Sequence, residues 1–222
     1  MLRIGPLLLT GASATAATFV LAAALVGALV HYRARLLASP LSISAALWIG
    51  FMIYWSVAAR NVAPTRSRES AQSRRVHEML LYGALLLVFV PVPGLDRRIL
   101  PSGTLVVAIG IAVQIASMLL ARSARQHLGR NWSAEITKKA DHQLVRSGPY
   151  AVVRHPIYTA ILGMFVGMAV VSGDLHAFLG VVLIAIAYYR KIRLEENNLR
   201  EVFGATYDDY TRTTRALIPW IL

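Results

Sequence analysis

Long apolar runs, free of charged residues, recur along this chain and decide what it can fold into. The first covers residues 12–30 and the second residues 41–59, and each is long enough to cross the hydrocarbon core of a bilayer as an α-helix. Over the 222 residues, 56% are hydrophobic. Because backbone groups inside a bilayer must be hydrogen-bonded within the protein, such runs predict an all-α, multi-pass integral membrane protein.

Further apolar runs follow, and turn residues separate them. They cover residues 79–92, 103–121, 157–171 and 175–189. Pro91, Pro93 and Gly94 end the third run, because proline cannot continue a helix. Only Ser172-Gly173-Asp174 joins the last two runs, and so short a link predicts an antiparallel helical hairpin. We therefore expect about six transmembrane helices, the last two of which form a tight hairpin.

The segments between the apolar runs are polar and basic. Residues 60–77, rich in Arg and Ser, predict a loop, and residues 123–154 form the longest polar region. Residues 190–222 predict a charged helical segment at the membrane surface, packed back on the hairpin. The pattern divides the chain into N-terminal transmembrane helices, residues 1–122, and a C-terminal region, residues 123–222. Within the fourth run, Gln114 is expected to hydrogen-bond to a neighbouring helix.

The positive charges are distributed unequally between the two sides of the expected bundle. With six crossings, 19 of the 23 Lys and Arg residues fall on the side that holds the termini and the long polar region. Positive residues favour the cytoplasmic side, so we expect the polar region and the C-terminal tail in the cytoplasm. This topology and contact with anionic lipids account for the net charge of +12, so we expect membrane lipids and no nucleic acid as partners.

Cysteine is absent, which excludes disulfides, thiolate nucleophiles and metal sites with Cys ligands. His31, His77, His127 and His176 lie in no recognisable motif, and the sequence assigns them no role. We predict no metal site.

The densest group of chemically distinctive residues lies in residues 147–158, where the longest polar region meets the apolar run that begins at residue 157. Pro156 has a fixed φ and no N–H, which suits the first position of the helix that follows. Arg154 and His155 therefore lie at a helix entrance. Backbone donors and the positive end of the helix dipole favour an anionic group there, such as a carboxylate.

A second motif follows the expected hairpin, which returns the chain to the same side. It consists of Glu195-Glu196 and, after a short spacer, residues 203–210, Phe-Gly-Ala-Thr-Tyr-Asp-Asp-Tyr. Together with residues 142–158, this pattern resembles the isoprenylcysteine carboxyl methyltransferase family and, more distantly, the phospholipid N-methyltransferases. The resemblance covers about residues 120–222.

The resemblance implies S-adenosylmethionine as the cofactor and makes residues 123–222 the cofactor-binding catalytic region. Carried over by position, the implied cofactor contacts are His142, Gln143, Leu144, Val145, Tyr150, His155, Pro156, Ile157, Tyr158 and Glu195. A substrate-contacting Arg of the family falls at the position of Lys191. The expected catalytic residues are Lys191 and Arg154. The chain is then expected to be a membrane methyltransferase, with its active site on the cytoplasmic side and a small or lipid-like acceptor, a carboxylate being favoured.

The type of acceptor decides what catalysis requires. A carboxylate needs no general base, so catalysis reduces to orientation and exclusion of water. An amine or a thiol must lose a proton, and His155 or Glu196 has a suitable side chain.

Other interpretations of the same residues remain open. Sterol reductases, which bind NADPH, share a similar C-terminal pattern, and a non-catalytic lipid-binding membrane protein would retain the same fold. The paired Glu195 and Glu196 also suit a solvated face of ion pairs with the nearby basic residues. Tyr207 and Tyr210 are expected to pack rather than to act in catalysis.

Overall fold

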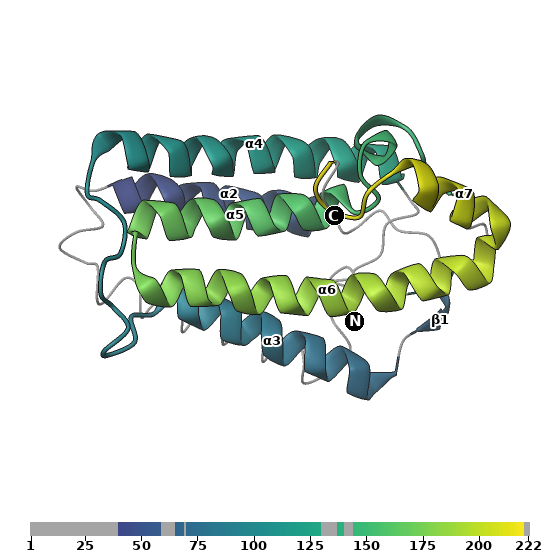
Figure 1. The fold of residues 1–222 in the computed structure, drawn as a ribbon, viewed down its shortest axis with the longest axis horizontal. Helices are drawn as coiled ribbons and strands as arrows, with labels where there is room; N and C mark the ends of the chain where they lie inside the picture. Colours follow the sequence, from purple (N-terminus) through teal and green to yellow (C-terminus); the bar gives the residue numbers. More distant parts are fainter. Residues whose placement is uncertain (1–39, 59–64, 69, 130–136, 140–143, 220–222) are drawn as a thin grey trace, which may run out of the picture.

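The computed structural model describes residues 40–58, 65–68, 70–129, 137–139 and 144–219. Its helices are α2 (Pro40–Ala58), α3 (Ala71–Phe89), α4 (Thr104–Leu128), α5 (Pro156–Ser172), α6 (Leu175–Phe203) and α7 (Ala205–Thr213), with a 3-10 turn, η2 (Gly148–Ala151) (Figure 1). Two short strands, β1 (Thr65–Arg68) and β2 (Thr137–Lys139), pair antiparallel and were not expected. The helical class is confirmed, and the expected span at residues 12–30 lies outside the described residues.

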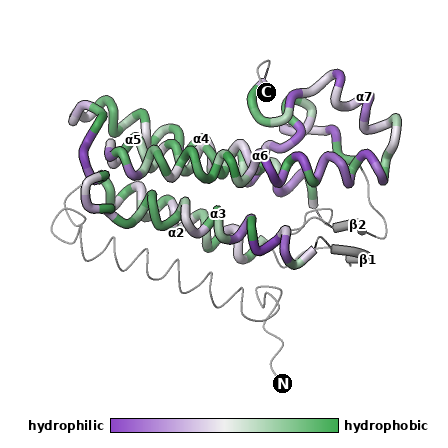
Figure 2. The backbone as a smooth tube through the Cα atoms, turned by 60° about the horizontal axis from the view of Figure 1, so that its bottom comes forward, coloured by the Kyte–Doolittle hydropathy of each residue, from purple (hydrophilic) through white to green (hydrophobic). Residues whose placement is uncertain are grey.

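Three of the described helices, α2, α4 and α6, are long and apolar enough to cross a membrane, judged by length and composition. α5 is also apolar, but it has 17 residues. Figure 2 shows that hydrophobic residues follow α4 and α5, whereas hydrophilic residues gather toward the end of α6 and along α7. The chain is an integral membrane protein with one strongly polar end.

Local sequence explains where several helices begin and end. The Ser70 side chain caps α3 by accepting a hydrogen bond from the Ser73 N–H over 3.2 Å. Gly173 ends α5 with a φ of 72°, in the left-handed region that favours glycine. After Gly173 and Asp174 the chain enters α6, which runs beside α5 in the opposite direction (Figure 1).

Helical structure extends further into the polar segments than the sequence suggested. α3 begins at Ala71 rather than after His77, since Ser70 caps it and Arg74 pairs with Glu78 one turn later, 3.8 Å apart. α4 continues to Leu128, and its last turns bury Ala124. The expected surface segment after residue 189 is instead a direct continuation of α6, because neither Gly nor Pro interrupts residues 181–203.

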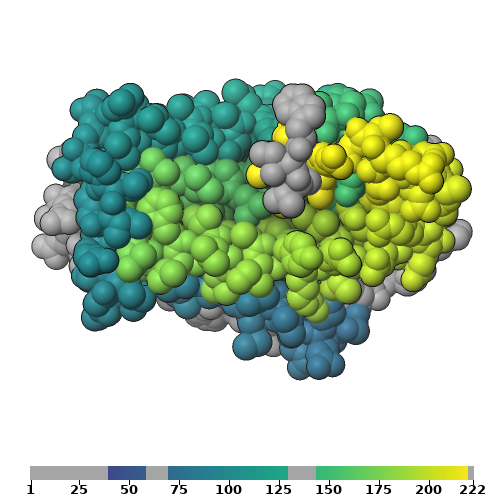
Figure 3. Space-filling model, viewed as in Figure 1, coloured from purple at the N-terminus to yellow at the C-terminus, as the bar shows by residue number. Residues whose placement is uncertain are grey.

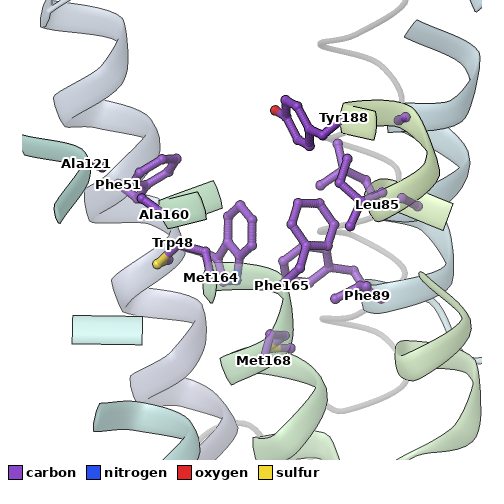
Figure 4. Close-up of a cluster of buried hydrophobic side chains, with 14 residues drawn as sticks. Trp48, Phe51, Leu85, Phe89, Ala121, Ala160, Met164, Phe165, Met168 and Tyr188 are labelled. Carbon is purple, nitrogen blue, oxygen red and sulfur yellow. The ribbon is translucent and has the colours of Figure 1, made fainter. Parts of the chain in front are cut away.

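Close helix contacts and an aromatic cluster form the core. Gly110 on α4 faces Gly167 on α5 so closely that a Cβ on Gly167 would lie 2.6 Å from the Gly110 carbonyl oxygen. On α2, Trp48 meets the ring of Phe165 edge-on at 5.0 Å (Figure 4). The expected interhelical hydrogen bond of Gln114 is confirmed, since Ser44 Oγ donates to its Oε1 over 2.7 Å.

Candidate functional site

Glu196 is the centre of a buried polar network between the start of α5 and the charged end of α6. Arg154 Nε donates to Glu196 Oε1 over 2.8 Å, and His155 Nε2 lies 3.3 Å from the same oxygen. Arg200, one turn further along α6, reaches the other carboxylate oxygen at 3.4 Å. The network brings together two of the residues that the sequence singled out, Arg154 and His155, and adds the second glutamate of the motif.

Glu196 lies beyond the apolar part of α6, in a stretch where 7 of the 14 residues 190–203 are charged. Burial alone would raise the pKa of Glu196, but hydrogen bonds from His155 and Arg154 and their charges outweigh it and lower the pKa to about 2. The carboxylate is therefore ionised at neutral pH and is a very weak base. This argues against Glu196 as a general base.

Glu195 lies beside Glu196 and joins the same network through His155, whose Nδ1 lies 3.8 Å from Glu195 Oε2. Tyr158 donates its hydroxyl hydrogen to Glu195 Oε2 over 2.7 Å, and the Tyr158 ring stacks on His155, with centroids 5.4 Å apart. Lys191 Nζ lies 5.7 Å from the centroid of the same tyrosine ring. The Glu195 side chain is 31% exposed, so its carboxylate is accessible from outside the helix packing.

The chain after α7 returns to the start of α5 (Figure 1). We call residues 214–217 the C-terminal strap. The backbone N–H of Arg154 donates to the Arg215 carbonyl over 2.8 Å, and that of His155 to the Ala216 carbonyl over 3.0 Å. Two side chains add to this contact, since Arg154 Nη1 donates to the Thr214 carbonyl and Thr159 Oγ1 to the Leu217 carbonyl.

The C-terminal strap corrects one expectation about the helix entrance. The sequence suggested that the backbone donors of Arg154 and His155 receive an anionic group, but both donate to carbonyl groups of the chain itself. Pro156 has no N–H to offer. An anionic ligand therefore has to be held by side chains or by other backbone groups.

Tyr207 is a feature of this site that the sequence interpretation underestimated. Its side chain is packed as expected, with 1% exposed, but its hydroxyl group has no hydrogen-bond partner among the described residues. Burial, and then the charge of Glu196, raise the pKa of Tyr207, whereas the charge of Arg154 lowers it. A buried, protonated hydroxyl beside the Glu196 network is thus left to pair with a ligand or a water molecule. The spacing Gly204-Ala205-Thr206-Tyr207 after Glu195-Glu196 was the available signal.

The other expected contact residues surround the start of α5. Tyr150 and Ile157 are buried in one apolar cluster with Ala124, and Val145 packs against this cluster. Tyr210 donates its hydroxyl hydrogen to the Tyr150 carbonyl over 2.5 Å, which attaches α7 to η2. Pro156 is buried in the first turn of α5, and Leu144 is half-buried. His142 and Gln143 lie outside the described residues.

α6 and α7 make up much of the face drawn in Figure 3, where the yellow C-terminal part lies against the teal and green segments.

Within the part of the chain that the structure describes, no group of three His, Asp or Glu side chains is arranged to hold a metal ion. The site therefore consists of two glutamates, their Arg, His and Tyr partners, and Lys191.

Comparison with protein families identifies this region. Residues 108–201, which include most of α4, all of α5 and most of α6, match the model of the isoprenylcysteine carboxyl methyltransferase (ICMT) family. The resemblance that the sequence suggested is confirmed for these residues.

Individual relatives show the same similarity. The chain is 27% identical over 115 residues to protein-S-isoprenylcysteine O-methyltransferase B of Arabidopsis thaliana, covering 50% of this chain and 58% of the relative. It is 33% identical over 94 residues to the nickel-cobalt-cadmium resistance protein NccN of Alcaligenes xylosoxydans xylosoxydans, covering 41% of this chain and 44% of that protein. The matches thus span about half the length of these curated relatives.

A solved structure extends the similarity of fold beyond the residues that match the family model. The structure described as the eukaryotic intramembrane Ras methyltransferase ICMT aligns with a TM-score of 0.50 and 19% sequence identity. The alignment covers 94% of this chain and 77% of the other. At this identity the match concerns the fold alone.

Proposed function

We propose, from the premise that residues 108–201 carry the sequence pattern of the ICMT family, that this chain is a membrane methyltransferase dependent on S-adenosylmethionine. One observation carries the proposal. Within the matched residues, Arg154, His155, Tyr158, Glu195 and Glu196 meet in one connected polar cluster where α5 begins. A solvated row of ion pairs, the simpler interpretation of the two glutamates, does not account for a buried Glu196.

The residues present fit the chemical groups of this cofactor. The accessible carboxylate of Glu195 suits ribose hydroxyl groups or an ammonium group. The hydroxyl of Tyr207, which has no hydrogen-bond partner among the described residues, suits a polar ligand atom. Apolar and aromatic side chains around the start of α5 suit a purine ring. The proposed contacts are His142, Gln143, Leu144, Val145, Tyr150, His155, Pro156, Ile157, Tyr158 and Glu195, to which we add Tyr207.

S-adenosylmethionine supplies, when bound, a methyl group activated by a sulfonium. Transfer to a carboxylate removes no proton, so the chain has to orient the acceptor and exclude water. Lys191 lies next to Tyr158 and is proposed to hold an anionic acceptor as a point charge. Arg154 already binds Glu196 and the C-terminal strap, so we assign it a positioning role rather than contact with the reacting atoms.

The proposed topology places this cluster on the cytoplasmic side of a bundle with about six crossings, the last two formed by α5 and α6. The uneven distribution of Lys and Arg supports this orientation. The acceptor is proposed to be a small or lipid-like carboxylate that reaches the site from the bilayer.

Ligand binding to the purified protein tests the proposal against its alternatives. Calorimetry is expected to detect S-adenosylhomocysteine and not NADPH. Binding of NADPH alone would indicate a membrane reductase of the sterol-reductase type, and binding of neither would indicate a non-catalytic lipid-binding protein. Methyl incorporation from labelled S-adenosylmethionine into lipid and small-molecule extracts then identifies the acceptor.

A further inference from the structure

A cleft outside the candidate site lies where the chain after α7 passes the end of η2. Residues 151–152 line it on the side of η2, and residues 212–215 and Pro219 line it on the side of α7 and the C-terminal strap. Its volume is about 360 Å³, within the range of about 300–1,000 Å³ that is common for small-molecule sites. None of the described residues that line the cleft is a proposed cofactor contact.

The cleft is basic. Two of the residues that line it, Arg212 and Arg215, are arginines, and among the described residues that line it none is acidic. The Arg212 side chain is 78% exposed and pairs with Asp209 over 3.2 Å. Arg215 is exposed as well, and no carboxylate of the described residues pairs with it. The cleft therefore retains a positive charge that favours an anion.

The two threonine hydroxyl groups of the cleft are already used as donors. Thr213 Oγ1 donates to the Tyr210 carbonyl over 3.1 Å, and Thr214 Oγ1 donates to the same carbonyl over 2.6 Å. The guanidinium groups are therefore the side-chain donors left for a ligand among the described lining residues. A guanidinium presents several N–H groups in one plane, which match the oxygen atoms of a phosphate or a carboxylate.

The place of the cleft in the fold favours a lipid as the ligand. Val152 lies four residues before Pro156, where the apolar helix α5 begins, so the cleft lies where the polar end of the protein meets its apolar part. Figure 1 shows the chain after α7 beside the start of α5. Val152 is 53% exposed, and Ile218, which precedes Pro219, is 44% exposed. Exposed apolar side chains beside cations suit an amphiphile with an anionic head group.

The cleft and the candidate site share the C-terminal strap. Arg215 lines the cleft, and its carbonyl accepts a hydrogen bond from the Arg154 N–H over 2.8 Å. A ligand held by the Arg215 side chain would therefore bind a segment whose backbone also holds the start of α5. Such binding should stabilise this contact and raise the Tm of the protein.

We propose that this cleft binds the phosphate group of an anionic phospholipid, with Arg212 and Arg215 as the phosphate contacts and with Val152 and Ile218 against the hydrocarbon part. A phosphate offers more acceptor oxygens than a carboxylate, so two guanidinium groups can share it. A lipid with a net negative charge is preferred over a zwitterionic one, because no carboxylate among the described lining residues can pair with a choline group. The proposed methyltransferase function is not needed for this site.

Soluble short-chain probes test the proposal on the full chain in dodecyl maltoside. The protein is titrated with dihexanoylphosphatidylglycerol, dihexanoylphosphatidylcholine or inorganic phosphate while the Tm is measured. The rise in Tm gives the half-saturating concentration of each probe. We expect phosphatidylglycerol to act at a concentration at least ten times lower than either of the others. The two lipids share acyl chains and a phosphate and differ in net charge, whereas inorganic phosphate lacks the lipid part.

Substitutions assign the binding to the cleft. Arg215→Gln removes a cation but keeps the backbone carbonyl that Arg154 uses, and it should raise the half-saturating concentration of phosphatidylglycerol about tenfold. Val152→Glu adds a carboxylate at an exposed position of the cleft and should weaken binding at least as much. Arg75→Gln is the matched control, since it removes an exposed cation at the start of α3, which Arg190 joins to the charged end of α6, and should leave binding unchanged.

Several results would overturn the inference. Equal half-saturating concentrations for the two lipids would mean that the cleft does not recognise charge, and an equal value for inorganic phosphate would mean that it takes a free anion and not a lipid. Equal losses in Arg215→Gln and Arg75→Gln, or wild-type binding by Val152→Glu, would mean that the lipid is attracted by the general surface charge. Because the titrations contain no S-adenosylmethionine, these results leave the proposed function untouched.

Discussion

Arg154 and Glu196 are 42 residues apart in the sequence, yet Arg154 Nε lies 2.8 Å from Glu196 Oε1, and both side chains are nearly buried. This ion pair joins the start of α5 to the charged end of α6, the two places where the sequence motifs occur. The same arginine holds the C-terminal strap. Arg154 therefore links both motifs to the C-terminal strap, and the contacts of His155 and Tyr158 with the two glutamates add to this link.

Removal of the arginine should leave a buried, ionised glutamate without its main partner. We expect Arg154→Gln to destabilise the protein by about 3 kcal/mol, since breaking a buried pair costs far more than breaking an exposed one. Thermal unfolding in detergent measures the loss. The matched control is Arg212→Gln, whose guanidinium is 78% exposed beside Asp209 and whose loss should cost less than about 1 kcal/mol. Equal effects of the two substitutions would contradict this account.

The same pair predicts a dependence of stability on pH. The pKa of Glu196 is lowered from 4.5 to about 2, so its ionised form stabilises the fold above pH 4.5, and this contribution is lost as the pH falls toward 2. The difference in Tm between wild type and Glu196→Gln should therefore be constant from about pH 7 to 5 and shrink at lower pH. A difference that instead grows on acidification would mean that Glu196 is protonated in the native protein.

Lys191 tests the charge of the acceptor. If the acceptor is a carboxylate, Lys191→Met should raise its KM about tenfold and leave cofactor affinity nearly unchanged, because only the acceptor loses an opposite charge. Steady-state kinetics with labelled cofactor gives both values. Arg190→Met and Arg193→Met are the comparison variants, and an unchanged KM in all three would show that no cation at these positions binds the acceptor.

The close crossing of α4 and α5 should tolerate no added atom. A Cβ at Gly167 would lie 2.6 Å from a backbone oxygen, so Gly167→Ala must separate the helices, at a cost of roughly 1–3 kcal/mol. Gly103→Ala provides the control, because a Cβ there meets nothing within 4 Å. A similar Tm for both variants would show that the crossing is looser than the structure indicates.

The order of the elements could be predicted from the sequence because the Gly and Pro residues that end helices act at their own position in the chain. Pro156 and Gly173 delimit α5 within one residue of the apolar run, and Gly204 ends α6. The continuity of α6 was missed for a related reason, since a change from apolar to charged residues does not interrupt a helix. Only a Gly or Pro residue would have ended α6 near Tyr189.

The site was less predictable than the fold. Adjacent glutamates on a helix face directions about 100° apart, and sequence alone does not say which one is buried. In the structure Ile184, Tyr188, Ile192 and Glu196, spaced four residues apart, form one buried stripe, which places Glu196 inside and Glu195 beside it. The C-terminal strap binds through backbone carbonyls, which carry no sequence signature.

Cofactor affinity at Glu195 tests the central claim most directly. Glu195→Gln should weaken S-adenosylhomocysteine binding by about 1.5–3 kcal/mol, roughly ten- to a hundredfold. The reason is that the substitution removes the charge which strengthens the hydrogen bond that the ligand donates to the Glu195 carboxylate. Glu201→Gln, at an exposed position on the same helix, is the matched control and should bind as wild type does. Calorimetry that gives the wild-type affinity for a well-folded Glu195→Gln protein would contradict the proposed cofactor site.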